Sequence, residues 1–87
     1  MVVVPEFEEF AKMVADVADV AEPGPADNFV EIGGDSLAAL QIAIVAEERW
    51  GAEIDVSEMV FAETVGEIHQ QLVRSIEDRA GSRPGAR

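Results

Sequence analysis

The stretch that decides the fold of this chain is Glu31-Ile32-Gly33-Gly34-Asp35-Ser36-Leu37. Its two glycines let the backbone turn, and Asp35 is a residue type favoured at the N-cap of a helix. Ser36 then falls on the first residue of a strongly apolar helical run. A hydroxyl at a helix N-terminus lies where free N–H groups and the helix dipole favour a negatively charged group. The pattern therefore suggests that Ser36 carries a phosphate-linked prosthetic group.

The run after Ser36 predicts a helix from Ser36 to about Trp50, ended by Gly51. The helix is apolar nearly all round, and a small bundle cannot bury both of its faces. One predicted face, for the core, contains Ala39, Ile42, Ala46 and Trp50. The other begins beside Ser36 and contains Leu37, Leu40 or Gln41, Ile44, Glu47 and Glu48. We interpret it as a surface on which partner proteins dock; the alternative is that this helix is simply the most buried one.

Outside this run, the sequence predicts two further long helices and one short one. Apolar residues at spacings of three and four indicate a helix from about residue 5 to 21, with Pro5 as a good first helical residue. Ser57 is predicted to cap a short helical turn through residues 58–62. Thr64 and Glu67 have the spacing of a capping box, which predicts the start of a last helix. The fold class is therefore all-α, with no strands.

A long loop is predicted from about residue 22 to 35, because Pro23, Gly24 and Pro25 end the first helix. Phe29 and Ile32 are its expected anchors in the core. We expect a single domain over residues 1–79 and a disordered tail over residues 80–87, which has no apolar residue worth burying.

Composition excludes several classes of function. The chain of 87 residues has a formal net charge of −12, so it repels phosphate backbones and should instead attract basic patches on protein partners. It has no cysteine, which excludes disulfides and thiolate chemistry of its own. Its longest nearly apolar run, residues 37–46, is interrupted by Gln41 and is about half the length of a membrane-spanning helix. We expect a cytoplasmic monomer that contacts neither nucleic acid nor membrane.

No catalytic constellation or metal site is visible in the sequence. Ser36 is not in a G-x-S-x-G elbow, and the only histidine, His69, is predicted to be a surface or packing residue. The acidic segments beginning at Asp27 and Asp55 do not fit a calcium-binding EF-hand loop. Without a base, Ser36 is a poor nucleophile. We therefore expect a protein that is not an enzyme, whose serine is activated by another protein.

The segment Phe29-Val30-Glu31-Ile32-Gly33-Gly34-Asp35-Ser36-Leu37 resembles the attachment motif of acyl and peptidyl carrier proteins. The resemblance extends over about residues 7–78 and implies the four-helix bundle of the acyl-carrier type. It implies that Ser36 receives 4′-phosphopantetheine from coenzyme A through a magnesium-dependent phosphopantetheinyl transferase. Gly33, Gly34, Asp35 and Leu37 match the rest of the motif, and Asp35 would also help to bind the metal ion of the transferase.

The resemblance further implies that the thiol of the arm holds building blocks as thioesters. An adenylating or acyl-transferring enzyme would load the arm, and condensing or tailoring enzymes would act downstream. Leu37, Ile44, Glu47 and Glu48 fall where carrier proteins present their partner-facing helix, and together with Leu40 and Gln41 from the helical pattern they make up the predicted docking residues.

The double glycine is most similar to carriers of nonribosomal peptide assembly, whereas the strong negative charge is typical of free-standing acyl carriers. Gln41 stands where many acyl carriers have an acidic residue. We predict a discrete peptidyl carrier in specialised biosynthesis of the nonribosomal peptide or polyketide type, such as that of antibiotics. An excised domain is the alternative to a stand-alone protein. The alternative functions are a fatty-acid-type acyl carrier and, less favoured, an acidic helical adaptor without an arm.

Overall fold

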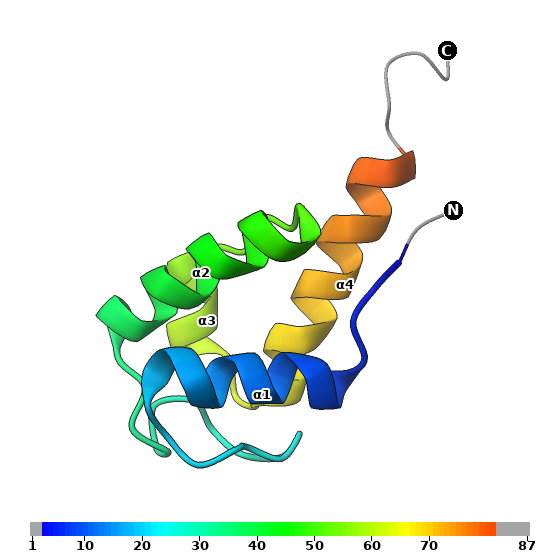
Figure 1. Cartoon of the computed structure of the whole chain (residues 1–87). Helices are drawn as coiled ribbons and strands as arrows, with labels where there is room; N and C mark the ends of the chain where they lie inside the picture. Colours follow the sequence, from blue (N-terminus) through cyan, green and yellow to red (C-terminus); the bar gives the residue numbers. More distant parts are fainter. Residues whose placement is uncertain (1–2, 82–87) are drawn as a thin grey trace.

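The computed structural model describes residues 3–81, which form four α-helices and no strand. They are α1 (Phe7–Ala18), α2 (Ser36–Trp50), α3 (Val56–Phe61) and α4 (Val65–Gly81). Figure 1 shows α1 crossing the bundle near its base, with α2 above it and α3 beside α2. Helix α1 packs on α2 and α4, and α2 packs on α3. The predicted all-α fold is confirmed, with three longer helices, one short helix and a long first loop.

Helix α1 is shorter at both ends than the predicted range of residues 5–21. Pro5 lies before the helix, whose N-cap residue is the extended Glu6. At the other end Asp19 adopts the left-handed conformation with φ 57° and ψ 51°. The Val20 N–H then donates to the Ala15 carbonyl at 3.2 Å. Aspartate tolerates this conformation better than most residues, so the chain turns away well before it reaches Pro23.

Helix α2 begins and ends where the sequence predicts. The Asp35 side chain accepts a hydrogen bond from the Ala38 N–H at 2.8 Å, and Gly51 closes the helix at φ 67°. Ala39, Ile42 and Ala46 are fully buried, and Trp50 is half-buried. This helix therefore gives one complete face to the core, as predicted.

The starts of α3 and α4 correct two predictions. Asp55, and not Ser57, caps α3: its side chain accepts from the N–H groups of Ser57 and Glu58, and the Ser57 hydroxyl donates to it at 2.6 Å. At α4, the Glu67 N–H donates to Thr64 Oγ1 at 3.2 Å, which is half of the predicted capping box. The Glu67 carboxylate accepts instead from the Glu63 N–H at 3.0 Å, one residue before the predicted donor.

Helix α4 is longer than predicted. It continues through Gly81, so residues 80 and 81 are helical rather than part of the predicted tail. Residues 82–87 of that tail lie outside the described residues. Within the described part of the chain, no helix combines the length and apolar character needed to cross a membrane.

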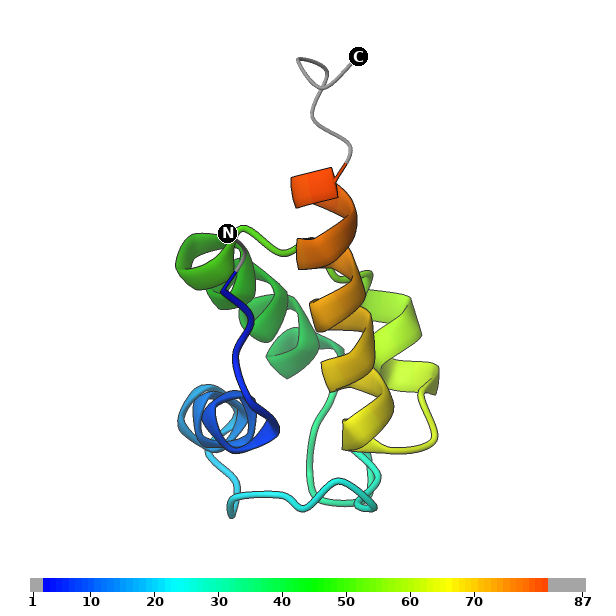
Figure 2. The ribbon, with the colours of Figure 1, turned by 90° about the vertical axis from the view of Figure 1, so that its right-hand side faces the viewer.

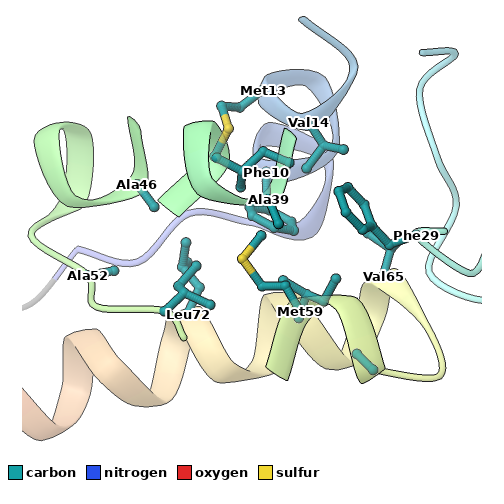
Figure 3. Close-up of a cluster of buried hydrophobic side chains, with 14 of the residues drawn as sticks. Phe10, Met13, Val14, Phe29, Ala39, Ala46, Ala52, Met59, Val65 and Leu72 are labelled. Carbon is teal, nitrogen blue, oxygen red and sulfur yellow. The ribbon is translucent and has the colours of Figure 1, made fainter. Parts of the chain in front are cut away.

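The core lies between α1, α2 and α4 and is closed by α3 and the first loop. Its largest fully buried side chains are Phe10, Phe29, Met13, Ile42, Met59, Ile68 and Leu72. Figure 3 shows Phe29 reaching in from the loop between Val14 of α1 and Val65 of α4. The loop is thus part of the core, and residue 36 follows directly from it.

Because Asp55 caps α3, the stability of the fold should depend on the pH in the acid range. The hydrogen bonds from Ser57 and Glu58 lower the pKa of the Asp55 carboxyl. A lowered pKa in the folded state adds stability above the unfolded-state pKa, and this stability is lost as the pH falls through the folded-state value. Asp55→Asn keeps an acceptor but removes the charge. We expect its thermal midpoint to be below that of the wild type at pH 7 and to approach it as the pH falls below 3.8, the ordinary pKa of aspartate, as thermal melts from pH 7 into the acid range would show. A constant difference would contradict this prediction.

Candidate functional site

Ser36 is the first residue of α2 and is exposed to solvent. The cap beside it uses two of the helix's first amides, since the Asp35 side chain binds the Ala38 N–H and the Asp35 carbonyl binds the Ala39 N–H at 2.9 Å. The earlier amides, of Ser36 and Leu37, cannot have intrahelical partners. A phosphate on the Ser36 oxygen would lie at the positive end of the helix dipole. The residues therefore fit a phosphate-linked group.

The two glycines of the motif have different roles. Gly33 adopts φ 110°, a conformation that L side chains rarely take, and its N–H donates to the Val30 carbonyl at 3.1 Å. Gly34 has no such strain but leaves room for a neighbour: a Cβ atom there would lie 2.4 Å from Cζ of the Phe29 ring. Gly33 thus sets the turn, and Gly34 lets the turn pack on the core directly before Ser36.

The long first loop is held by both side chains and backbone. Phe29 is 1% exposed and Ile32 is half-buried against the core, so both predicted anchors are confirmed. Asn28 adds an anchor that the sequence did not reveal: its side-chain amide donates to the Glu63 carbonyl at 3.1 Å and to the Ala62 carbonyl at 3.4 Å. A contact between residues this far apart in sequence leaves no local pattern.

The loop also supplies hydrogen-bond acceptors for the first N–H groups of α4. The Val65 N–H donates to the Asp27 carbonyl at 2.6 Å, and the Gly66 N–H donates to the Pro25 carbonyl at 3.0 Å. These amides belong to the first turn of α4, which has no intrahelical acceptors for them. Figure 2 shows the loop passing beneath this turn. The segment that leads to Ser36 is consequently tied to the base of α4.

The predicted docking residues share one exposed face of α2. Leu37 is 62% exposed, Leu40 47% and Ile44 48%, and the polar members Gln41, Glu47 and Glu48 are also exposed. Both members of the pair left open by the helical pattern, Leu40 and Gln41, thus lie on the surface. Apolar residues that stay exposed beside Ser36 fit a docking role, which stays a prediction.

One exposed apolar residue was missed. Phe61, the last residue of α3, is 84% exposed, more than any apolar residue of the α2 face. The sequence contained a weak signal for this exposure. A helix of six residues can turn only one side to the core, and Met59, two residues before Phe61, lies on that side.

His69, the only histidine of the sequence, packs against the start of α1. His69 Nε2 lies 2.9 Å from the Pro5 carbonyl, and its ring contacts the rings of Phe7 and Phe10 at centroid distances of 5.6 and 5.8 Å. His69 is thus a packing residue, one of the two roles, surface or packing, that the sequence analysis left open. Among residues 3–81 no group of three or more histidine or carboxylate side chains is placed to hold a metal ion.

A helical bundle with an exposed serine at the start of α2, beside an exposed apolar face, is the arrangement that the sequence predicted for a carrier protein. The chain matches the family described as "Phosphopantetheine attachment site" over residues 8–72, and it belongs to this family. Its prosthetic group is accordingly 4′-phosphopantetheine, bound covalently through a serine. Members of this family are carriers and not enzymes, which agrees with the prediction from sequence.

The structure is similar to a solved structure from the Pax NRPS. That structure is the non-covalent extended docking domain complex PaxA T1-CDD/PaxB NDD, and the match has a TM-score of 0.73. It covers 99% of this chain and 84% of the Pax chain at 18% sequence identity, which shows a shared fold. No curated protein sequence matches this chain significantly.

Proposed function

We propose that Ser36 is the residue that carries 4′-phosphopantetheine, and that the thiol of this arm holds acyl, aminoacyl or peptidyl intermediates as thioesters. The observation that carries the proposal is the exposed Ser36 hydroxyl at the N-terminus of α2, directly after the capping Asp35, within the family match. The arm supplies the thiol that a chain without cysteine lacks.

Each residue around Ser36 contributes to presenting the hydroxyl. Asp35 fixes the start of α2, and Gly33 and Gly34 allow the turn before it to pack on Phe29. The first amides of α2 stabilise the negative charge of the phosphodiester. The arm is then carried by a rigid helix end and not by a loose loop.

The partners follow from this role. They are a magnesium-dependent phosphopantetheinyl transferase, an adenylating or acyl-transferring loading enzyme, and downstream condensing or tailoring enzymes. We infer that they dock on the α2 face, where exposed Leu37, Leu40 and Ile44 lie beside Gln41, Glu47 and Glu48. The net charge of −12 favours partners with basic surfaces and speeds their encounter.

We further propose that the pathway is of the nonribosomal peptide or polyketide type. The double glycine before Asp35 and the likeness to the PaxA T1-CDD/PaxB NDD complex of the Pax NRPS support this assignment. Carriers of fatty-acid synthesis more often have a single glycine there.

The attachment residue can be tested by mass spectrometry. Purified protein is incubated with coenzyme A, Mg²⁺ and a broad-specificity phosphopantetheinyl transferase, and its intact mass is measured. The wild type should gain the mass of one phosphopantetheine, whereas Ser36→Ala should gain none. Ser57→Ala is the matched control, because Ser57 is also exposed in the first turn of a helix capped by aspartate, and it should be modified like the wild type.

Two results would overturn the proposal. One is an unchanged wild-type mass with a transferase that modifies another carrier in parallel. The other is modification that persists in Ser36→Ala.

A further inference from the structure

Phe61 is an exposed aromatic side chain that the proposed function does not use. It is 84% exposed, and the next most exposed large apolar residue in the described chain is Val3 at 77%. A phenylalanine ring that stays in water gives up much of the free energy that its burial would supply. Aromatic side chains are enriched in protein–protein interfaces relative to the rest of the surface, so an exposed phenylalanine ring fits a residue that a partner covers.

The backbone that carries this ring is held in place. The next residue, Ala62, is buried, and its carbonyl accepts from the Asn28 side chain. The N–H of Glu63 donates to the Glu67 carboxylate at 3.0 Å, and its carbonyl accepts from Asn28 at 3.1 Å. The exposure of Phe61 is thus a property of the fold and not of a frayed helix end. A ring on a fixed backbone costs little entropy to bind.

The same bonds connect Phe61 to the modification site. Asn28 is followed by Phe29, whose carbonyl accepts from the Gly34 N–H at 2.9 Å, two residues before Ser36. Figure 2 shows the turn between α3 and α4 next to this loop. The segment that leads to Ser36 is therefore hydrogen-bonded to the turn that follows Phe61.

Carboxylates lie on both sides of the ring in sequence. Glu58 and Glu63 are exposed, whereas the basic residues of the described chain lie in α1, at the end of α2 and in α4. The complementary surface is an apolar pocket with Lys or Arg at its rim.

Among the proposed partners, the transferase must come closest to the surface of the carrier. Enzymes that act on the loaded thiol meet the far end of the arm. The transferase acts before the arm exists and has to bring its own site to the Ser36 oxygen. We propose that Phe61 inserts into an apolar, basic-rimmed pocket of the phosphopantetheinyl transferase that modifies Ser36. This inference rests on the proposed attachment at Ser36.

The test is the steady-state kinetics of arm transfer by a broad-specificity transferase, with the carrier as varied substrate. Phe61→Ser should lower kcat/KM about tenfold, mainly through a higher KM, because aromatic anchors dominate such interfaces and the reacting atoms are untouched. Val3→Ser is the control, because Val3 is an apolar residue ahead of α1 that is 77% exposed, and its kcat/KM should match that of the wild type. Glu63→Lys should lower kcat/KM about threefold at low salt and less at high salt.

The outcomes separate this inference from the attachment proposal. All three variants retain Ser36 and should reach full modification on long incubation. A Phe61→Ser protein with wild-type kcat/KM would overturn the inference and leave Ser36 as the attachment residue. A loss of kcat/KM that is accompanied by a lowered thermal midpoint would also overturn the inference, because Phe61 would then stabilise the fold. A wild-type protein that is never modified would overturn the attachment proposal itself.

Discussion

Gly34→Ala is expected to lower the free energy of unfolding by about 3 kcal/mol, the upper end for overpacking a core. The added Cβ would lie 2.4, 2.5 and 2.6 Å from three carbon atoms of the Phe29 ring. These distances are far inside van der Waals contact, so the ring has to move. Phe29 is 1% exposed and surrounded by core residues, which leaves the ring no free space. The substitution therefore disturbs the core and the turn before Ser36 together.

Chemical denaturation of the wild type and four variants tests this explanation. Gly24→Ala is the matched control, because the nearest atom to its added Cβ lies 3.7 Å away, and its stability should stay within about 0.5 kcal/mol of the wild type. In a Phe29→Leu background the smaller side chain should relieve the clash, so Gly34→Ala should cost clearly less there. An equal cost in both backgrounds would contradict the steric explanation.

Ile42→Ala is expected to cost about 2–5 kcal/mol, because it removes a fully buried side chain from the centre of the bundle. A domain of this size is stable by only about 5–15 kcal/mol, so the variant should melt at a much lower temperature. Ile44→Ala is the matched substitution two residues further along the same helix, at a side chain that is 48% exposed. It should cost less than about 1 kcal/mol.

Ile42→Ala and Ile44→Ala also distinguish an effect on stability from an effect on partner docking. Ile44→Ala should raise the KM of the transferase or of a loading enzyme for the carrier while its thermal midpoint stays near that of the wild type. Thermal melts by circular dichroism and steady-state kinetics on one preparation would measure both. Equal destabilisation by the two substitutions would show that the α2 face is part of the core. An unchanged KM for Ile44→Ala with every partner would argue against docking through this residue.

The start and end of α2 could be predicted because their signals are local. The Asp35 cap, the apolar run and Gly51 at the end act within one or two helical turns of each residue, and the structure confirms all three. The position of Ser36 at a helix N-terminus follows from the same short stretch. The end of α1 could not be predicted this way, because Asp19 and the prolines after it are both able to end a helix and only the folded chain selects Asp19.

What the sequence by itself determined is therefore the set of helices, the attachment motif and the face of α2 that turns away from the core. The tertiary structure alone decided how the motif is held. It placed Phe29 against Gly34, joined Asn28 to the carbonyls of Ala62 and Glu63, and left Phe61 in solvent. Caps and helical periodicity act between residues a few positions apart. The Asn28 bonds join residues 34 and 35 positions apart in sequence, and such pairs become neighbours only when the core forms.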